Sequence, residues 1–322
     1  MVPLLELRHV SKFYGQGKAL FSALEDISLT LRADQPEIFT IAGESGSGKS
    51  TFANLVLGFS APSEGDILFN GQPVHAARGT PDKSYFRQVQ AVFQDPFEVY
   101  NPFYRVRHVF DMAIRNFDLA ENKQAADKII EDSLNIVGLT GEDILRKYPH
   151  QLSGGQRQRV MMARAYLMKP RLIVADEPVS MVDTSLRAAI LDVMMRLRDE
   201  KGISFIYITH DLSTAFQIGD RIMMLYQGRV AEQGPTSDVI TQPKHPYVKL
   251  LVDSVPRPDP ARNWLGNIEL PAEEADRLPH QNGCRYASRC PHVMYVCKGR
   301  TPALENHPGS NRLTACFIEQ EG

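Results

Sequence analysis

The sequence lacks long apolar runs and a charge excess of either sign, and both absences limit what the chain can be. No stretch approaches the ~20 consecutive apolar residues of a membrane-spanning helix, and the charged residues Glu6 and Arg8 interrupt a start that does not resemble a signal peptide. The formal net charge of the 322 residues is −2, so we expect no general basic surface and no nucleic-acid partner. These absences favour a protein that stays in the cytoplasm.

Cysteine is absent from the first 283 residues, and all four cysteines lie beyond that point, at Cys284, Cys290, Cys297 and Cys316. Disulfides are disfavoured in a reducing cytoplasm. Four thiolates could instead hold a metal site, either Zn²⁺ or an iron–sulfur cluster. The spacing C-x5-C-x6-C-x18-C differs from the paired C-x2-C of zinc ribbons, and the alternative is a set of plain buried or free thiols.

A glycine-rich loop lies between a predicted strand and a predicted helix. Residues 37–41 are rich in β-branched and aromatic side chains, which is typical of a strand, and the apolar run 52–57 indicates a helix. The loop between them, GESGSGKS, matches the phosphate-binding pattern GxxxxGK[ST]. Its backbone N–H groups and the N-terminus of the helix suit a phosphate. The predicted nucleotide-binding residues are Gly43, Ser45, Gly46, Gly48, Lys49, Ser50 and Thr51.

A second predicted strand, residues 171–175, ends in two carboxylates, Asp176 and Glu177. A continuous apolar strand is typical of the centre of a parallel sheet, and its carboxyl end is where such sheets bind ligands. We expect Asp176 to hold Mg²⁺ and Glu177 to orient or deprotonate the attacking water. The alternative is a buried strand that ends in solvated acids before Pro178, but a phosphate loop needs a Mg²⁺-holding acid.

A second glycine loop, Leu152-Ser-Gly-Gly-Gln156, begins another predicted helix. Ser153 and Gln156 form a capping-box pattern, which leaves the paired glycines unexplained. The loop matches the signature motif of the ABC (ATP-binding cassette) ATPases, which the chain resembles over roughly residues 4–254. The resemblance implies an α/β fold: a RecA-like P-loop core with an antiparallel β portion and an inserted helical subdomain. It also implies that Ser153, Gly154, Gly155 and Gln156 contact ATP bound to the opposite subunit of a head-to-tail dimer.

The other landmarks of the family follow in order. Tyr14 matches the aromatic residue that stacks on adenine, with neighbouring Phe13 as a competitor. Gln94 matches the glutamine that reaches Mg²⁺ and the attacking water, and His210 matches the histidine that contacts the γ-phosphate. Asp183 matches the D-loop acid, although this chain has Met-Val where the family more often has Ala-Leu. The resemblance thus implies catalysis by Glu177, His210 and Gln94, and Mg²⁺ bound through Ser50, Gln94 and Asp176.

The organisation of the chain agrees with a single cassette. Residues 96–168 carry apolar residues at helical spacing and predict the helical subdomain. There is no second phosphate loop, which argues against a fused double cassette, and no long heptad insert, which argues against DNA-tethering relatives such as SMC or Rad50. The aromatic-rich segment 97–110 is either the cleft that receives a coupling helix of a membrane subunit or core of the helical subdomain.

The composition shifts after residue 254, where a Pro-rich linker begins, so we expect a nucleotide-binding domain over 1–254 and an extension over 255–322. His245-Pro-Tyr247, Ser254-Val-Pro-Arg-Pro258 and the segment Gly283–Pro291 resemble the extension of the oligopeptide/dipeptide/nickel importer ATPases. Some members of that family carry a [4Fe–4S] cluster there. The chain combines the motifs LSGGQRQR and VFQDP. In this it resembles the second ATPase of these importers (F-type) more than the first (D-type).

The resemblance implies an ATP-hydrolysing subunit of a membrane ABC importer of peptides or a related solute, either a nickel chelate or an oligosaccharide. The implied partners are a second, non-identical cassette, two permeases and an extracytoplasmic solute-binding protein, with this chain bound peripherally at the cytoplasmic face of the inner membrane. The alternatives are a soluble ABC ATPase associated with ribosomes, DNA repair or cluster assembly, an exporter subunit, and a metal-sensing regulator. The solute itself is chosen by other subunits.

Overall fold

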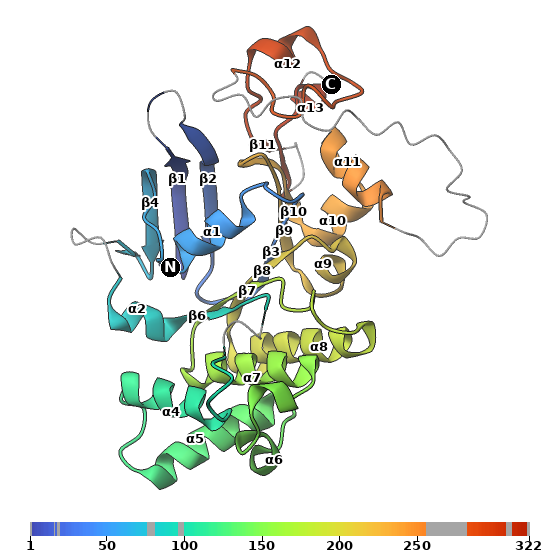
Figure 1. Cartoon of the computed structure of the whole chain (residues 1–322). Helices are drawn as coiled ribbons and strands as arrows, with labels where there is room; N and C mark the ends of the chain where they lie inside the picture. The colour runs from blue at the N-terminus through green and yellow to red at the C-terminus, as the bar shows by residue number, and fades with distance from the viewer. Residues whose placement is uncertain are drawn as a thin grey trace.

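Two β-sheets form the frame of the molecule (Figure 1). The structure is a computed structural model that describes residues 2–15, 17, 20–75, 81–95, 100–255, 282–306 and 311–320. Within these ranges, none of the helices combines the length and apolar character that a bilayer crossing requires.

The first sheet is antiparallel, in the order β2-β1-β4-β5. One face lies on the core, so buried residues such as Leu5 and Leu7 alternate with the less buried Glu6 along β1. Strands β1 and β2 pair from Leu5↔Leu31 to Tyr14↔Phe21, which places two aromatic residues opposite each other at the turn end of the hairpin. The strands are β1 (Leu5–Tyr14), β2 (Phe21–Leu31), β4 (Glu64–Phe69) and β5 (Gln72–Pro73).

The second sheet has the order β11-β12-β10-β9-β3-β8-β7-β6, in which β9, β3, β8, β7 and β6 run parallel. The carboxyl ends of these strands meet at one edge, which is where the site forms. Strand β12, from the end of the chain, pairs with β10 and extends the sheet. The strands are β3 (Ile38–Ala42), β6 (Val89–Val92), β7 (Leu172–Asp176), β8 (Ser204–Thr209), β9 (Arg221–Tyr226), β10 (Arg229–Pro235), β11 (Glu305–Asn306) and β12 (Leu313–Thr314).

Both faces of the parallel strands are covered, which is why they are almost continuously apolar. Phe205 and Tyr207 of β8 belong to the core shared with the helical subdomain, whereas Ile206 and Ile208 belong to the core shared with α1 and the antiparallel sheet. The helices are α1 (Lys49–Val56), α2 (Lys83–Gln88), α8 (Thr184–Lys201), α9 (Leu212–Ile218), α10 (Thr236–Thr241), α11 (Pro246–Asp253), α12 (Tyr295–Gly299) and α13 (Phe317–Gln320).

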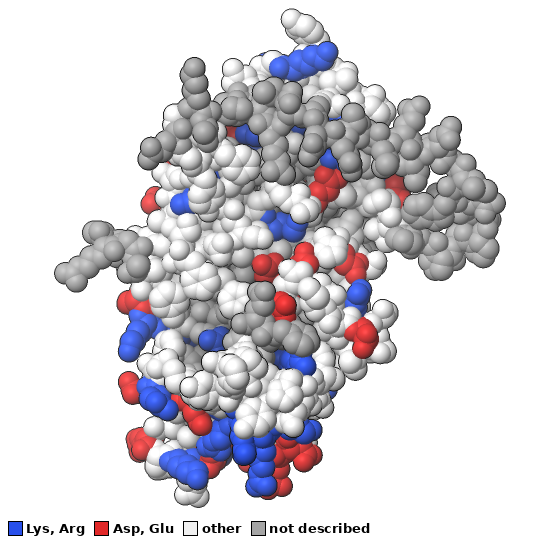
Figure 2. Space-filling view, in the orientation of Figure 1, with Lys and Arg blue, Asp and Glu red and all other residues white. Residues whose placement is uncertain are grey.

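The helical subdomain lies below the sheets in Figure 1. Its described helices run from Arg107 to Leu167, and residues 96–99 of the predicted segment 96–168 are outside the described residues. It consists of α4 (Arg107–Asn116), α5 (Lys123–Ile136), α6 (Gly141–Leu145), a 3₁₀ turn (Pro149–Gln151) and α7 (Gly154–Leu167). Figure 2 shows Lys and Arg mixed with Asp and Glu over this subdomain, whereas the middle of the same face carries fewer charges.

Candidate active site

The phosphate loop connects β3 to α1, and its glycines are required by backbone geometry. Gly43 has φ +153°, and a Cβ there would lie 2.2 Å from the carbonyl oxygen of Leu225. Gly48, the N-cap of α1, has φ +108°, and its Cβ would lie 2.6 Å from the carbonyl oxygen of Ala23. Only glycine accommodates both the positive φ and the close backbone approach, so the loop can curl around an anion at the helix N-terminus.

Lys49 is folded back onto its own loop. Its Nζ donates to the carbonyl oxygens of Gly43 at 2.7 Å and of Glu44 at 2.8 Å. Burial lowers the pKa of Lys49, while the charges of Glu177, Asp176 and Glu44 oppose that shift. A triphosphate on the loop would offer this ammonium stronger, charged acceptors than two carbonyls.

A cavity of about 690 Å³ opens over the loop. Residues that follow β3, β6, β7 and β8 meet here because these four strands are neighbours in the sheet. The lining consists of Phe21, Ala23, Ser45, Gly46, Gly48, Lys49, Ser50, Thr51, Gln94, Asp176, Glu177 and His210. The structure therefore brings the predicted loop, the two acids, the glutamine and the histidine together.

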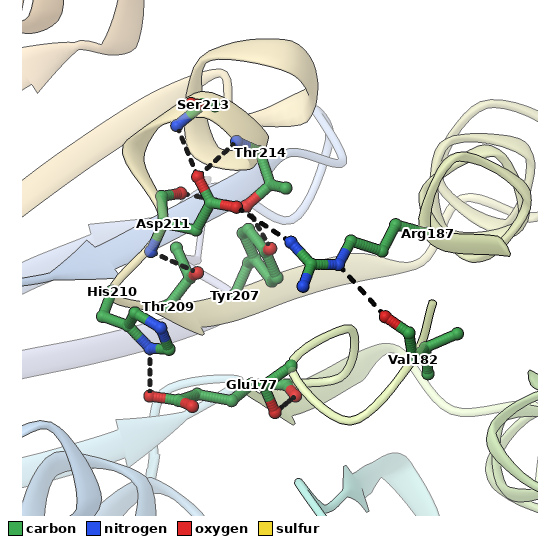
Figure 3. A network of polar contacts seen from close by, with 10 residues as sticks. Glu177, Val182, Arg187, Tyr207, Thr209, His210, Asp211, Ser213 and Thr214 are labelled. Atoms are coloured by element: carbon green, nitrogen blue, oxygen red, sulfur yellow. Dashed lines mark hydrogen bonds and ion pairs between the residues drawn. The ribbon is translucent and has the colours of Figure 1, made fainter. Parts of the chain in front are cut away.

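Glu177 and His210 form a pair at the ends of β7 and β8 (Figure 3). His210 Nδ1 lies 2.8 Å from Glu177 Oε1. Glu177 has φ +44°, an unfavourable backbone conformation for a residue with a side chain. It is held there by its N–H to the Ile208 carbonyl, at 2.9 Å, and by the Ser180 hydroxyl, which donates to the Glu177 carbonyl at 2.9 Å. Such strain at the end of a strand is typical of a functional position.

Asp176 is the half-buried acid at the end of β7. Burial raises its pKa, the adjacent charge of Glu177 raises it further, and Lys49 opposes the shift. A divalent cation at this point would relieve the repulsion between the two carboxylates. The Ser50 hydroxyl, the Gln94 amide and the Asp176 carboxyl all line the cavity and provide the oxygen ligands that Mg²⁺ prefers alongside phosphate oxygens. This donor set fits Mg²⁺.

Figure 3 also shows a network that joins the D-loop, residues 180–183, to helix α9. Arg187 Nε donates to the Val182 carbonyl at 3.2 Å, and its Nη1 lies 3.6 Å from Asp211 Oδ2. Asp211, next to His210, caps α9 by accepting the N–H of Ser213 at 2.9 Å. Sequence reasoning missed both Arg187 and Asp211. The Asp-Leu-Ser-Thr sequence after His210 carries an N-cap signal, whereas nothing in the sequence singles out Arg187.

The signature loop, residues 152–156, lies outside this cavity. Ser153 and Gln156 form the predicted capping box, with N–H···O distances of 3.2 and 3.1 Å. A Cβ on Gly155 would lie 3.0 Å from Leu186 Cδ1, and one on Gly154 would lie 3.5 Å from the Met181 carbonyl oxygen. Gly155 thus lets α7 pack closely against Leu186 of α8, whereas a side chain at Gly154 would be in ordinary contact with the Met181 carbonyl. The signature residues Ser153, Gly154, Gly155 and Gln156 do not line the cavity, and neither does Asp183.

At the edge of the cavity, two aromatic residues are candidates for the adenine ring. Tyr14 and Phe21 are cross-strand partners, 44% and 45% exposed, and Lys12 Nζ lies 5.2 Å from the centre of the Tyr14 ring. Phe21 lines the cavity, whereas Tyr14 does not. Sequence reasoning missed Phe21, because only the hairpin register identifies it as the partner of Tyr14.

The four cysteines are free; Cys297 and Cys316 are buried, and Cys284 and Cys290 are half-buried. Burial raises the pKa of Cys284 to about 11, and the neighbouring thiols contribute to the shift. Burial likewise raises the pKa of Cys290 and Cys316, which favours thiols over thiolates. Throughout the described part of the chain, no three His, Cys, Asp or Glu side chains are arranged to hold a metal ion. The predicted iron–sulfur or zinc site is therefore not supported by this geometry.

Comparison with known proteins gives two family matches. The family described as ABC transporter matches residues 24–180, and the family described as oligopeptide/dipeptide transporter, C-terminal region, matches residues 231–297. A putative oligopeptide transport ATP-binding protein of Bacillus subtilis is 35% identical over 320 residues, covering 98% of this chain and 96% of its own. A dipeptide transport ATP-binding protein of Haemophilus influenzae is 34% identical over 321 residues, with the same coverage.

Solved structures agree with these matches. The dimeric ATP-binding cassette MJ0796, bound to ADP and Pi, is 28% identical, with a TM-score of 0.62 over 72% of this chain and 98% of that one. The protein cbiO1 of Clostridium perfringens, part of the ABC transporter complex cbiONQ, is 27% identical, with a TM-score of 0.66 over 75% of this chain and 92% of that one.

Proposed function

The chain belongs to the ABC transporter ATPases, in the group with an oligopeptide/dipeptide transporter C-terminal region, and on that premise we propose that it hydrolyses ATP to drive uptake of peptides, or of a related solute such as a nickel chelate or an oligosaccharide. The observation that carries the ATPase assignment is the cavity in which the phosphate loop faces Asp176, Glu177, Gln94 and His210. The peptide assignment is supported by relatives named for peptide transport.

Each residue of the cavity has a role in the proposed reaction. The loop amides and Lys49 bind the phosphates, once Lys49 exchanges the Gly43 and Glu44 carbonyls for phosphate oxygens. Ser50, Gln94 and Asp176 would hold Mg²⁺, which would neutralise phosphate charge. Glu177 orients or deprotonates the attacking water, and the His210 ring orients the Glu177 carboxylate through their 2.8 Å contact.

A second cassette is needed to complete this site. The signature residues and Asp183 lie outside the cavity of their own chain, so we propose that they serve the nucleotide of a partner, as the dimeric form of MJ0796 suggests. We propose a related but non-identical partner, with this chain as the F-type subunit. An extracytoplasmic binding protein would deliver the solute.

Permeases are the proposed membrane partners, and the cytoplasmic face of the membrane is the proposed location. The aromatic segment after Gln94 supports docking there: Tyr100 and Phe110 are core residues, but Phe103 is 85% exposed and Tyr104 is 50% exposed. Relatives named as transport subunits argue against the soluble, non-transport alternative.

The test is a pull-down of the tagged chain from gently solubilised native membranes, followed by mass spectrometry. Recovery of two polytopic permeases and a second cassette is the expected result. Recovery only from the soluble fraction, with ribosomal, DNA-repair or cluster-assembly proteins, would overturn the transport assignment and leave the ATPase assignment standing.

A metal on the cysteines is a separate proposal, a [4Fe–4S] cluster or Zn²⁺. Its support comes from the sequence alone, where all four cysteines are confined to the C-terminal segment, whereas the described residues offer no group arranged to hold a metal. Anaerobic purification followed by iron and zinc analysis tests it. Protein with neither metal would leave the four cysteines as metal-free structural residues.

A further inference from the structure

Glu44, the second residue of the phosphate loop, does not line the nucleotide cavity, whose lining within the loop begins at Ser45. Glu44 instead contacts two residues from the distant C-terminal part of the chain: its main-chain N–H contacts Tyr247, 203 positions away, and its carboxylate contacts Arg289, 245 positions away. These contacts join the phosphate loop to the C-terminal part of the chain.

The first contact is a two-pronged ion pair with Arg289. Nη1 lies 2.8 Å from Glu44 Oε2, and Nη2 lies 3.1 Å from Oε1. Two parallel charge-assisted hydrogen bonds define the orientation of both groups. The guanidinium also lies over the rings of Tyr226 and Tyr286, 5.8 Å from each ring centre, so its own position is restricted by stacking.

The second contact joins the Glu44 main chain to Tyr247. The Glu44 N–H donates to the Tyr247 hydroxyl at 2.9 Å, and that hydroxyl donates to the Leu225 carbonyl at 3.3 Å. Tyr247 is fully buried near the start of α11, with its ring centre 4.6 Å from that of Tyr226. The Leu225 carbonyl oxygen is the atom that a Cβ at Gly43 would approach, so one tyrosine holds the start of the loop against β9.

We propose that Tyr247 and Arg289 are positioning residues for ATP binding, and that the C-terminal region supports the phosphate loop by holding Glu44. Both residues lie within residues 231–297, the segment matched by the C-terminal family. The inference rests on the nucleotide site of the proposed function and assigns that segment a task in the ATPase itself.

Two physical arguments support the assignment. When ATP draws Lys49 away from the Gly43 and Glu44 carbonyls, the glycine-rich loop loses two of its internal hydrogen bonds. The bonds from Tyr247 and Arg289 then remain among those that limit its conformational freedom. Arg289 also neutralises the Glu44 carboxylate, which would otherwise stand unpaired beside a loop that binds a polyanion.

The test measures the Kd of a fluorescent ATP analogue with Mg²⁺ on the full-length chain, together with its thermal unfolding without nucleotide. Tyr247→Phe removes only the hydroxyl, and Arg289→Gln removes the charge. We expect each to weaken binding about five- to tenfold, the effect of losing one such hydrogen bond. The matched controls are Tyr295→Phe, an exposed tyrosine of the same extension, and Arg300→Gln, which lies over Phe317 in that extension. Both should bind within about twofold of wild type.

A rescue experiment separates positioning from a general structural role. Arg289→Gln leaves the Glu44 carboxylate unpaired, so adding Glu44→Gln should restore much of the lost affinity, to within about threefold of wild type. Additive losses, or unchanged Kd values in folded variants, would overturn the inference. A wild-type chain that bound no nucleotide would instead overturn the proposed function.

Discussion

Single residues carry much of the chemistry, and His245 shows how the fold can suppress a charge. Burial lowers its pKa to about 4, with a contribution from Lys249. Its Nδ1 accepts the N–H of Tyr247 at 3.0 Å and caps α11, so the ring must stay unprotonated at that nitrogen. From the sequence, His245-Pro-Tyr247 was noted only for its resemblance to the importer family. The burial that lowers the pKa of His245 depends on segments that are distant in sequence and could not be predicted.

The pKa of His245 predicts a pH dependence of stability. In the unfolded chain His245 becomes protonated below about pH 6.5, whereas in the folded chain it stays neutral until about pH 4. The free energy of unfolding should therefore fall as pH drops from 6.5 to 4, by about 3 kcal/mol in total. His245→Asn keeps a capping side chain but cannot titrate. Urea unfolding at several pH values should show a shallower slope for this variant than for wild type, and equal slopes would contradict the assignment.

Glu177 is the residue for which we expect the largest loss of activity. Glu177→Gln retains the shape and loses the base, so ATP turnover should fall by ~10²–10⁴ while ATP binding is retained. Steady-state phosphate release by the purified complex measures the change. Glu200→Gln, an exposed change on α8, is the matched control. A Glu177→Gln variant with wild-type turnover would remove Glu177 from the mechanism.

At the scale of elements, the sequence predicted most of the frame but not the contacts between distant parts. The strand before the phosphate loop, the strand before Asp176 and the helix after the signature loop were all predicted to within a residue or a few, because periodicity and capping are local properties. The pairing of β12 with β10 was not predicted, because a two-residue strand has no periodic signal.

The link between α8 and α9 gives a prediction at the same scale. Arg187 joins the Val182 carbonyl to Asp211 but is about one-third exposed, so Arg187→Ala should lower the free energy of unfolding by less than about 1 kcal/mol. ATP turnover should fall several-fold more than in Arg196→Ala, a surface change on the same helix, because the D-loop and the residue after His210 lose their connection. Parallel ATPase and thermal unfolding measurements test this, and equal turnover in the two variants would contradict it.

At the scale of the whole molecule, the resemblance to ABC importer ATPases is confirmed by relatives that match nearly the full chain. The ordered family motifs sufficed for this, because each is a local pattern with its own chemistry. The support of the phosphate loop by Tyr247 and Arg289 could not be predicted in the same way. It depends on which distant segments fold against the loop, and the cysteines beside Arg289 drew attention to metal instead.

The contact between Glu44 and Arg289 also sets an order of events in time. Translation proceeds from the N-terminus at ~5–20 residues per second, and 245 positions separate the two residues. The phosphate loop is therefore synthesised roughly 10 to 50 seconds before the arginine that pairs with it. A nascent chain, or one truncated before Arg289, would have the loop without this support, so full nucleotide affinity would arise only after residue 289 has been synthesised.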